Sequence, residues 1–237
     1  MNIENKYQDF LAEFNKYLEH INKKATLIAV SKTKPIDNIV SLCRLGHCDF
    51  GENYAQEFRD KIKDERFSNF NIRWHFIGNI QRNKLKYIVG KSSLIHTVDS
   101  YDKAEMINDF SIKIDSVQPI LLQVNISRDP KKGGVSAEEV NSLFPKLMML
   151  KNIKINGLMT ITQYSEDPEN CRNDYKEMKN LSSILESKYG GSLELSMGMS
   201  NDYKVALDEG ATMVRVGTKI FGERRNCLLY TSPSPRD

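Results

Sequence analysis

A lysine at the end of an apolar run is the first residue of this sequence with a clear chemical use. Lys32 follows TLIAVS and shares strand parity with Ile28 and Val30, so its amine points into a core if those two side chains do. In a closed, partly apolar site the pKa of a lysine falls, and the neutral amine can attack an aldehyde. Position alone favours the alternative, a lysine that extends from a strand end into solvent. Lys34 has the same parity but abuts Pro35, which makes it the weaker candidate.

Two glycine-containing turns near the end of the chain are candidates for binding an anion. Gly198-Met199-Ser200-Asn201 opens a short helical stretch, and Gly217-Thr218 follows an apolar run. Backbone N–H groups at the start of a helix, with small residues that allow close approach, bind phosphate. Each glycine alone could equally serve a tight turn. The two turns together favour a phosphate site.

Arg215 and one of the four histidines are further candidates. Arg215 precedes the second glycine turn, and its guanidinium can only donate hydrogen bonds, although a surface salt bridge is the alternative. His75 lies within the apolar RWHFIG, where a lone histidine is more often a satisfied core residue than a general base. The other three, His20, His47 and His96, show no ligand spacing, so we predict no metal site.

The elements that carry these residues alternate between strand and helix. One amphipathic helix, with apolar residues every three or four positions from Tyr7 to Ile21, precedes eight strand–helix units. The predicted strands are 26–32, 48–52, 73–78, 93–99, 119–126, 153–161, 192–198 and 211–217. The predicted helices end at about Leu45 in the first unit, closed by Gly46, and then span 54–67, 81–89, 101–114, 137–150, 168–189 and 202–209.

This alternation predicts an α/β fold, a single (β/α)₈ TIM barrel with an extra N-terminal helix. In such barrels the working residues lie at the C-terminal ends of the strands, which is where Lys32, Ser200 and Gly217 are expected. An open doubly wound sheet is the alternative, but no GxGxxG or GxxxxGK[ST] motif supports it. We predict one domain over residues 1–226. The Ser/Pro-rich CLLYTSPSPRD at 227–237 should be a disordered tail outside the evolved domain.

Bulk properties predict a cytoplasmic protein with neither nucleic acid nor a membrane as partner. The formal charge is only +3 and both signs are scattered along the chain, which argues against a nucleic-acid surface. No apolar stretch approaches the about 18 residues of a membrane span, and MNIENKYQDF lacks the features of a signal peptide. The cysteines, Cys43, Cys48, Cys171 and Cys227, have no metal-site spacing and are expected to be free thiols in a reducing compartment.

Eight segments, in chain order, resemble the pyridoxal phosphate homeostasis protein family, which in turn resembles the N-terminal barrel of alanine racemase. They are AVSKTKP (29–35), FGENYAQE (50–57), WHFIGNIQRNK (74–84), HTVDS (96–100), LLQVNIS (121–127), GLMTI (157–161), LSMGMSNDY (195–203) and EGATMVRVGTKIFGER (209–224). The resemblance covers most of the chain from residue 26 to 224. In the loop KKGG (131–134), Lys132 and Gly134 fit the lysine and glycine of the family pattern.

The resemblance implies a site for pyridoxal 5′-phosphate (PLP). Lys32 would be the Schiff-base lysine, and Arg215 would face the pyridine nitrogen, keep it unprotonated and so make the ring a poor electron sink. The remaining implied contacts are Ser200, Gly217 and Thr218 on the phosphate, Asn53 and His75 in the pocket lining, and Met159 near the ring.

By the same resemblance the protein would be a monomer in PLP (vitamin B6) homeostasis, a carrier or buffer without substantial catalysis that passes PLP to apo PLP-dependent enzymes. A weak PLP-dependent racemase or decarboxylase is the enzymatic alternative. Such enzymes need a second, β-rich domain and a second acid/base, and we expect no room for the former here. A third reading is an aldolase-like enzyme that uses Lys32 without PLP. It predicts that borohydride traps a keto substrate on a colourless protein.

Overall fold

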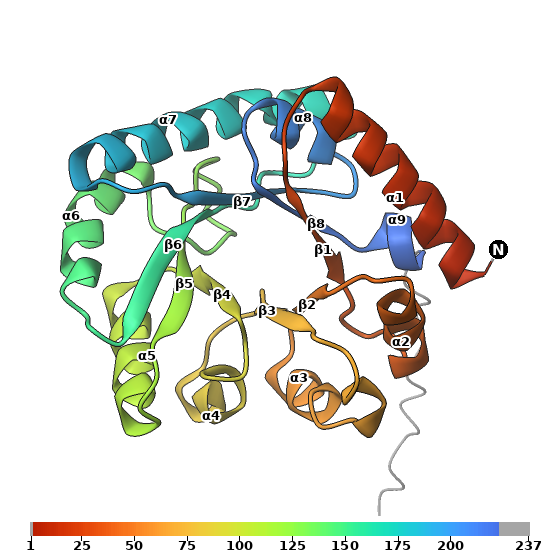
Figure 1. The fold of residues 1–237 in the computed structure, drawn as a ribbon. Coiled ribbons are helices and arrows are strands. Elements are labelled where there is room, and N and C mark those ends of the chain that lie inside the picture. The colour runs from red at the N-terminus through yellow and green to blue at the C-terminus, as the bar shows by residue number, and fades with distance from the viewer. Residues whose placement is uncertain (1, 223–237) are drawn as a thin grey trace, which may run out of the picture.

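Eight short parallel strands pair in chain order, and the first also pairs with the last, so that the sheet closes into a barrel (Figure 1). The computed structural model describes residues 2–222. The strands are β1 Thr26–Val30, β2 Asp49–Glu52, β3 Arg73–Phe76, β4 Leu94–Val98, β5 Gln118–Gln123, β6 Ile153–Met159, β7 Glu194–Met199 and β8 Met213–Val216. This confirms the predicted (β/α)₈ barrel, and each strand lies within one residue of its predicted segment or inside it.

Helices surround the barrel, and α1 precedes the first strand as predicted (Figure 1). The α-helices in residues 2–222 are α1 Ile3–His20, α2 Ile36–Arg44, α3 Ala55–Lys61, α4 Leu85–Ile88, α5 Tyr101–Lys113, α6 Ala137–Met148, α7 Arg172–Tyr189, α8 Tyr203–Asp208 and α9 Thr218–Phe221. Short 3₁₀ turns occur at η1 Glu65–Phe67, η2 Arg82–Lys84 and η3 Pro168–Cys171.

Three predicted helices are therefore interrupted. The helix expected over 54–67 ends at Lys61, and the Asp64 side chain instead accepts a hydrogen bond from the backbone N–H of Arg66. Aspartate often competes in this way for backbone donors that a continuing helix would use. The expected helices over 81–89 and 168–189 each begin with a 3₁₀ turn, and α9 was not predicted at all.

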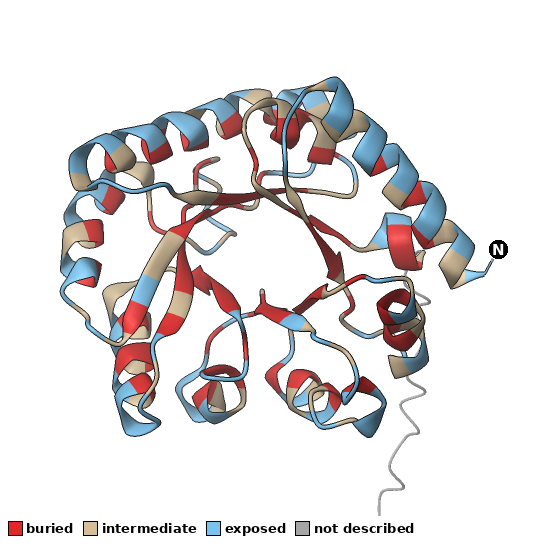
Figure 2. Ribbon diagram, viewed as in Figure 1, coloured by how far each residue is buried: buried red, intermediate tan, exposed pale blue. Residues whose placement is uncertain are grey.

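Most residues of the barrel strands are buried (Figure 2), and their apolar side chains form two clusters. Residues such as Ala29 and Phe50, which are cross-strand neighbours in β1 and β2, belong to the large core between strands and helices. The barrel interior holds a second, smaller apolar cluster of Leu94, Leu121 and Met159. Because side chains alternate along a strand, β4, β5 and β6 contribute residues to both of these clusters.

The N-terminal helix is tied to the last elements of the barrel. Phe10 of α1 stacks edge-on against Tyr203 of α8 with ring centroids 5.5 Å apart, and Tyr17 donates a 2.6 Å hydrogen bond to Asp208. Lys23, just after α1, donates to the backbone oxygen of Asp208 at 2.6 Å. These contacts hold α1 beside α8.

Three further predictions concern membrane-spanning helices, the cysteines and the C-terminal tail. None of the helices in residues 2–222 combines the length and the apolar character needed to cross a bilayer. Cys43 and Cys171 are buried free thiols and Cys48 is a half-buried one, whereas Cys227 lies outside the described residues. The predicted domain boundary at residue 226 and the tail at 227–237 also lie outside them.

Candidate functional site

Lys32 lies in the turn directly after β1, at the C-terminal end of the barrel strands. The turn is closed by a 3.0 Å hydrogen bond from the Lys34 N–H to the Ser31 oxygen. Thr33 has φ 61°, a left-handed conformation that is unusual for a β-branched residue. Such backbone strain persists only where surrounding contacts enforce it, and it occurs often at functional sites.

A buried ion cluster enforces the backbone on both sides of Lys32. The Lys61 ammonium donates to the Ser31 carbonyl at 2.8 Å and to the Glu52 carboxylate at 2.7 Å. Lys61 also pairs with Glu57 at 2.7 Å, and Glu57 accepts the backbone N–H of Thr33 at 2.7 Å. The residue before Lys32 and the residue after it are thus bonded to the same cluster.

Glu52 is the most deeply buried member of this cluster. Glu52 is fully buried, and the Ser31 hydroxyl donates a hydrogen bond to its carboxylate at 2.5 Å. Burial raises the pKa of the Glu52 carboxyl, against the opposite effect of the Lys61 charge and hydrogen bond.

Lys34, the weaker sequence candidate, reaches a different part of the molecule. Its ammonium donates to the backbone oxygens of Phe221 at 3.4 Å and Gly222 at 3.3 Å, at the end of α9. A cation at a helix C-terminus is favoured by the helix dipole. The amine of Lys34 therefore has a structural role, which leaves Lys32 as the candidate nucleophile.

The two predicted anion-binding turns lie together beside the Lys32 turn. The Gly217 N–H donates to the Ser200 hydroxyl at 3.3 Å, and a Cβ on Gly217 would lie 3.5 Å from Val30, two residues before Lys32. Thr218 follows as the exposed first residue of α9. Since a hydroxyl and a backbone amide can both turn toward an anion, this group could hold a phosphate.

A sharp turn after β7 places Ser200. Gly198 has φ 91°, and a Cβ there would lie only 2.5 Å from the Ala206 Cβ, so the position requires glycine. The Asp202 carboxylate then accepts the Met199 N–H at 2.6 Å and fixes the turn. Ser200 is thereby presented toward the end of β8.

Arg215 lies inside the barrel rather than in a surface salt bridge. Its side chain is buried and donates to the Ser196 hydroxyl at 2.6 Å and to the Thr160 oxygen at 2.8 Å. Burial lowers its pKa to about 10, which leaves a cation at neutral pH. Within residues 2–222 no carboxylate lies within salt-bridge distance of this guanidinium. It therefore remains a strong donor.

His75 has both ring nitrogens engaged inside the barrel. Nε2 lies 3.1 Å from the Asp49 carboxylate, and Nδ1 lies 3.0 Å from Nε2 of His96. The residue is buried, as expected for the core reading of the sequence. Its place as a residue that lines a cofactor pocket stays a prediction.

Asn53 and Met159, the remaining predicted contacts, lie at the ends of different strands of the barrel. Asn53 follows β2, and Met159 is the last residue of β6. The Asn53 side-chain oxygen is buried without a hydrogen-bond partner in the described chain. A Cβ on Gly78 would fall 1.7 Å from the Asn53 carbonyl oxygen, so the loops after β2 and β3 touch there. Met159 is fully buried in the interior apolar cluster.

Together these residues could hold a small ligand with an aldehyde at one end and a phosphate at the other. The amine of Lys32 and the Ser200–Gly217 pair lie at the same end of the barrel, and Arg215 offers donors to a ring acceptor from the interior. The unpartnered oxygen of Asn53 is a buried acceptor that a ligand donor would satisfy. The residues present thus fit PLP.

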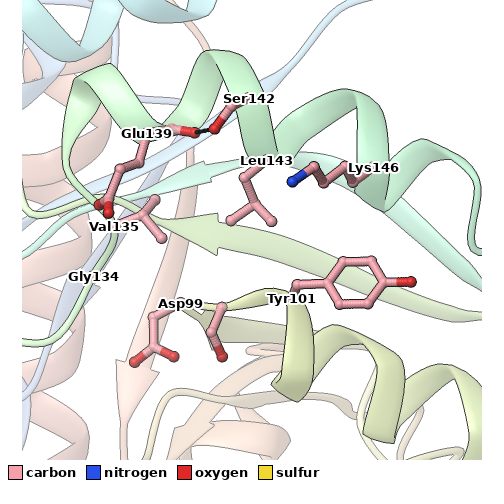
Figure 3. A pocket seen from close by; sticks show the side chains of 9 residues that line it. Asp99, Tyr101, Gly134, Val135, Glu139, Ser142, Leu143 and Lys146 are labelled. Carbon is pink, nitrogen blue, oxygen red and sulfur yellow. Dashed lines mark hydrogen bonds between the residues drawn. The ribbon is translucent and has the colours of Figure 1, made fainter.

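Two other features do not belong to this group. A cavity of about 550 Å³ lies between the start of α5 and α6, lined by residues that include Asp99, Tyr101 and Lys146, and none of the predicted site residues lines it (Figure 3). No group of three or more His, Cys, Asp or Glu residues within 2–222 is arranged to hold a metal ion.

Two groups of residues near the site were not predicted from the sequence. Lys61 and Glu57 lie one turn apart on α3, a spacing that suggests only a surface pair. Asp49, His96 and Ser196 are buried polar residues that lie on β2, β4 and β7. Polar residues at inward positions of several strands were the available signal for an interior polar group.

Comparison with known proteins places the chain in a family. The model of the family "Alanine racemase, N-terminal domain" matches residues 7–225. A pyridoxal phosphate homeostasis protein of Aquifex aeolicus is 42% identical over 202 residues, which cover 85% of this chain and 88% of that protein. Another, of Vibrio alginolyticus, is 38% identical over 200 residues, or 84% of this chain and 86% of that one.

Solved structures of similar proteins point to the same family. PipY of Synechococcus elongatus with PLP bound superposes with a TM-score of 0.82 at 30% identity, covering 93% of this chain and 100% of PipY. The structure of PipY without PLP gives a TM-score of 0.84 at 31% identity with the same coverage. The chain, built on an alanine racemase N-terminal-type barrel, therefore belongs to the pyridoxal phosphate homeostasis protein family.

Proposed function

We propose that this protein binds PLP as a Schiff base on Lys32 and acts in PLP homeostasis as a reversible carrier or buffer. The observation that carries the proposal is the juxtaposition of the Lys32 turn with the Ser200–Gly217 pair at the C-terminal end of β1 and β8. PLP supplies an aldehyde that a lysine amine captures. The family and the PLP-bound PipY structure support the same ligand.

Each predicted residue has a part in this proposal. Ser200, with the backbone of Gly217 and Thr218, would hold the phosphate, while Arg215 would donate to the pyridine nitrogen. Asn53 and Met159 would border the ring, and His75 would act from behind Arg215 rather than on the ring itself.

The proposed role is non-catalytic. A guanidinium that cannot give up its proton keeps the pyridine nitrogen unprotonated, which weakens the ring as an electron sink for amino-acid chemistry. The relatives are named for homeostasis, which agrees with storage and release. We propose that the protein does this as a cytoplasmic monomer and passes PLP to apo PLP-dependent enzymes.

The test is the visible spectrum of the protein mixed with PLP, before and after borohydride, with mass mapping of the reduced adduct. Lys32→Arg and Lys34→Arg form a matched pair, because arginine keeps the cation and removes the amine that captures an aldehyde. We expect a yellow protein whose adduct maps to Lys32, lost in Lys32→Arg and retained in Lys34→Arg. A colourless, unmodified wild type would refute the proposal.

The racemase alternative is tested on the same protein. The PLP-loaded chain is incubated with alanine in deuterated water, and α-deuterium is measured by mass spectrometry. Sustained exchange that Lys32→Arg abolishes would replace the carrier proposal by a catalytic one.

A further inference from the structure

A single line of hydrogen bonds crosses the interior of the barrel and ends on Arg215. It runs from the Asp49 carboxylate to His75 (3.1 Å), from His75 to His96 (3.0 Å), and from His96 to the Ser196 hydroxyl (2.9 Å). The last link is the 2.6 Å bond that Arg215 donates to Ser196. His96 is on β4 and Ser196 on β7, strands that are not neighbours in the barrel (Figure 1), so the line crosses the barrel interior.

The two ends of this line determine the position of every proton in it. An ionised carboxylate only accepts, so Nε2 of His75 carries the proton that faces Asp49. In a neutral imidazole Nδ1 then accepts, and His96 must donate to it from its own Nε2. His96 Nδ1 consequently accepts from the Ser196 hydroxyl, whose oxygen accepts from Arg215. All four bonds point toward Asp49, with none left unsatisfied.

The charged groups at each end favour this state. Although burial raises it, hydrogen bonds from His75 and Arg73 lower the pKa of Asp49 to about 2, so that the acceptor end is ionised. Burial lowers the pKa of His96 well below its usual value, and the neighbouring His75 and Arg215 lower it further.

The two ends also open onto different surroundings. Asp49 and Arg73 line a cavity of about 390 Å³ beside α1, at the N-terminal end of the strands. Arg73, 55% exposed, bonds Asp49 from that side. The other end is the Arg215 guanidinium, which faces the proposed ring of PLP. The negative charge at the far end of the line, the Asp49 carboxylate, is therefore connected to Arg215 through His75, His96 and Ser196 and is not paired with it directly.

We propose that Ser196, His96, His75 and Asp49 are positioning residues for Arg215: one directed chain of hydrogen bonds, with both imidazoles as neutral Nε2–H tautomers, orients the guanidinium as a donor toward the cofactor ring. This inference rests on the proposed PLP site. A carboxylate paired directly with Arg215 would occupy the donors that the ring needs, whereas a serine hydroxyl orients the guanidinium without neutralising it.

The first test needs no PLP. The protein labelled with ¹⁵N-histidine is studied by NMR at about pH 8, above the range in which an unperturbed imidazole titrates, and signals are assigned with His75→Gln and His96→Gln. We expect both His75 and His96 to be Nε2–H tautomers. An Nδ1–H tautomer at either residue would overturn the directed chain, whether or not the protein binds PLP.

The second test measures the ring end by itself. The ligand 5′-deoxypyridoxal has the ring and aldehyde of PLP but no phosphate, so its dissociation constant reports contacts to the ring. We expect Ser196→Ala to weaken both ligands by the same factor, about tenfold for one charge-assisted hydrogen bond, and to shift the visible band of the bound ring. Ser196→Thr, which keeps the hydroxyl, should restore both readouts.

Matched variants separate this role from general packing. Ser182 on α7 is equally buried but its hydroxyl has no partner in the described chain, so Ser182→Ala should leave both dissociation constants unchanged. His96→Phe keeps a ring and removes both nitrogens, and should reproduce the Ser196→Ala effect. Wild-type affinities and spectrum in Ser196→Ala would refute the positioning role. A wild type that binds neither ligand would refute the PLP site, while the NMR result still decides the chain.

Discussion

The residue before Lys32 and the residue after it are both bonded to charged side chains of one ion cluster, which leaves the turn little freedom. Lys61 holds the Ser31 carbonyl, and Glu57 holds the Thr33 N–H. Thr33 thus keeps a left-handed φ of 61° that would otherwise relax. The direction of the Lys32 side chain is a property of this cluster as much as of Lys32.

Removing Lys61 should expose how much the cluster depends on it. Lys61→Met leaves the fully buried Glu52 carboxylate without its cation, and we expect a loss of about 3–5 kcal/mol in unfolding free energy. Urea denaturation followed by circular dichroism measures it. The double variant Glu52→Leu/Lys61→Met removes both charges and should regain most of the loss. A single variant as stable as wild type would show that the cluster is not a stabilising unit.

The low pKa of Asp49 leads to a prediction about the stability of the fold in acid. Its pKa is about 2 in the folded chain, below the value of about 3.9 in an unfolded one. Its ionised form therefore stabilises the fold above about pH 4, and this contribution is lost as the pH falls toward 2. We expect Asp49→Asn to cost about 2 kcal/mol at pH 7, with the difference from wild type shrinking below pH 4. Urea titrations at several pH values test this, and a difference independent of pH would contradict it.

At the scale of elements, the N-terminus of α6 is stabilised by a capping box in its first turn. The Ser136 hydroxyl accepts the Glu139 N–H at 3.2 Å, and the Glu139 carboxylate accepts the Ser136 N–H at 2.9 Å. This capping box satisfies donors that have no partner within the helix. It matters here because Pro145 inside the helix removes one backbone donor farther along.

Ser136→Ala should therefore cost about 1 kcal/mol of unfolding free energy. Ser142 on the same helix is a matched control, since its exposed hydroxyl bonds only the Glu139 carbonyl three residues back. Alanine is a better helix former there, so Ser142→Ala should be neutral or slightly stabilising. Thermal unfolding of the two variants measures the contrast, and equal effects would argue against the capping box.

The loops after β2 and β3 pack closely against each other where Gly78 meets the backbone of Asn53. A Cβ on Gly78 would lie 1.7 Å from the Asn53 carbonyl oxygen, a backbone atom, so Gly78→Ala must separate the two loops. We expect a loss of about 1–3 kcal/mol, as for other overpacked sites, and weaker PLP binding through Asn53. In Gly133→Ala the added Cβ meets ordinary contacts at 3.4 Å or more, so stability should hardly change. Retained stability and PLP affinity in Gly78→Ala would show that the loops can move apart.

For the whole molecule, PLP binding and folding should be linked. A ligand that binds only the folded barrel stabilises it, by about 2.7 kcal/mol at a concentration of 100 times its dissociation constant. We therefore expect PLP to raise the melting temperature of the wild type, and to raise that of Lys32→Arg less. Differential scanning calorimetry with matched PLP concentrations tests this. Equal shifts in both proteins would place the main PLP contact elsewhere.

The architecture could be predicted from the sequence because strand and helix periods alternate so regularly. Gly46, for example, ends the first barrel helix in a left-handed conformation, φ 88°, as its place after Leu45 predicts. The end of α3 at Lys61 was harder to predict. The Asp64 side chain competes locally for a backbone donor, and Lys61 makes tertiary bonds to Ser31 and Glu52 that the sequence does not reveal.

The candidate site was predictable in its parts but not in its connections. Strand parity made Lys32 a candidate for the barrel interior, and Arg215 was singled out by its place before the second of the two glycine-containing turns, which hold Ser200 and Gly217. What parity does not reveal is which inward polar residues meet across the barrel. The bond between His96 and Ser196 joins residues 100 positions apart on strands that are not neighbours.

The pairing of β1 with β8 has a consequence for the timing of biosynthesis. Val216, next to the glycine turn, is the cross-strand neighbour of Ala29, so the first strand completes its sheet with the last. While the chain emerges from the ribosome, Lys32 is made well before its partner turn at Gly217. Until β8 has been made, the nascent chain has the Lys32 amine but no glycine turn beside it. We expect the protein to acquire its ligand only after β8 has completed the barrel.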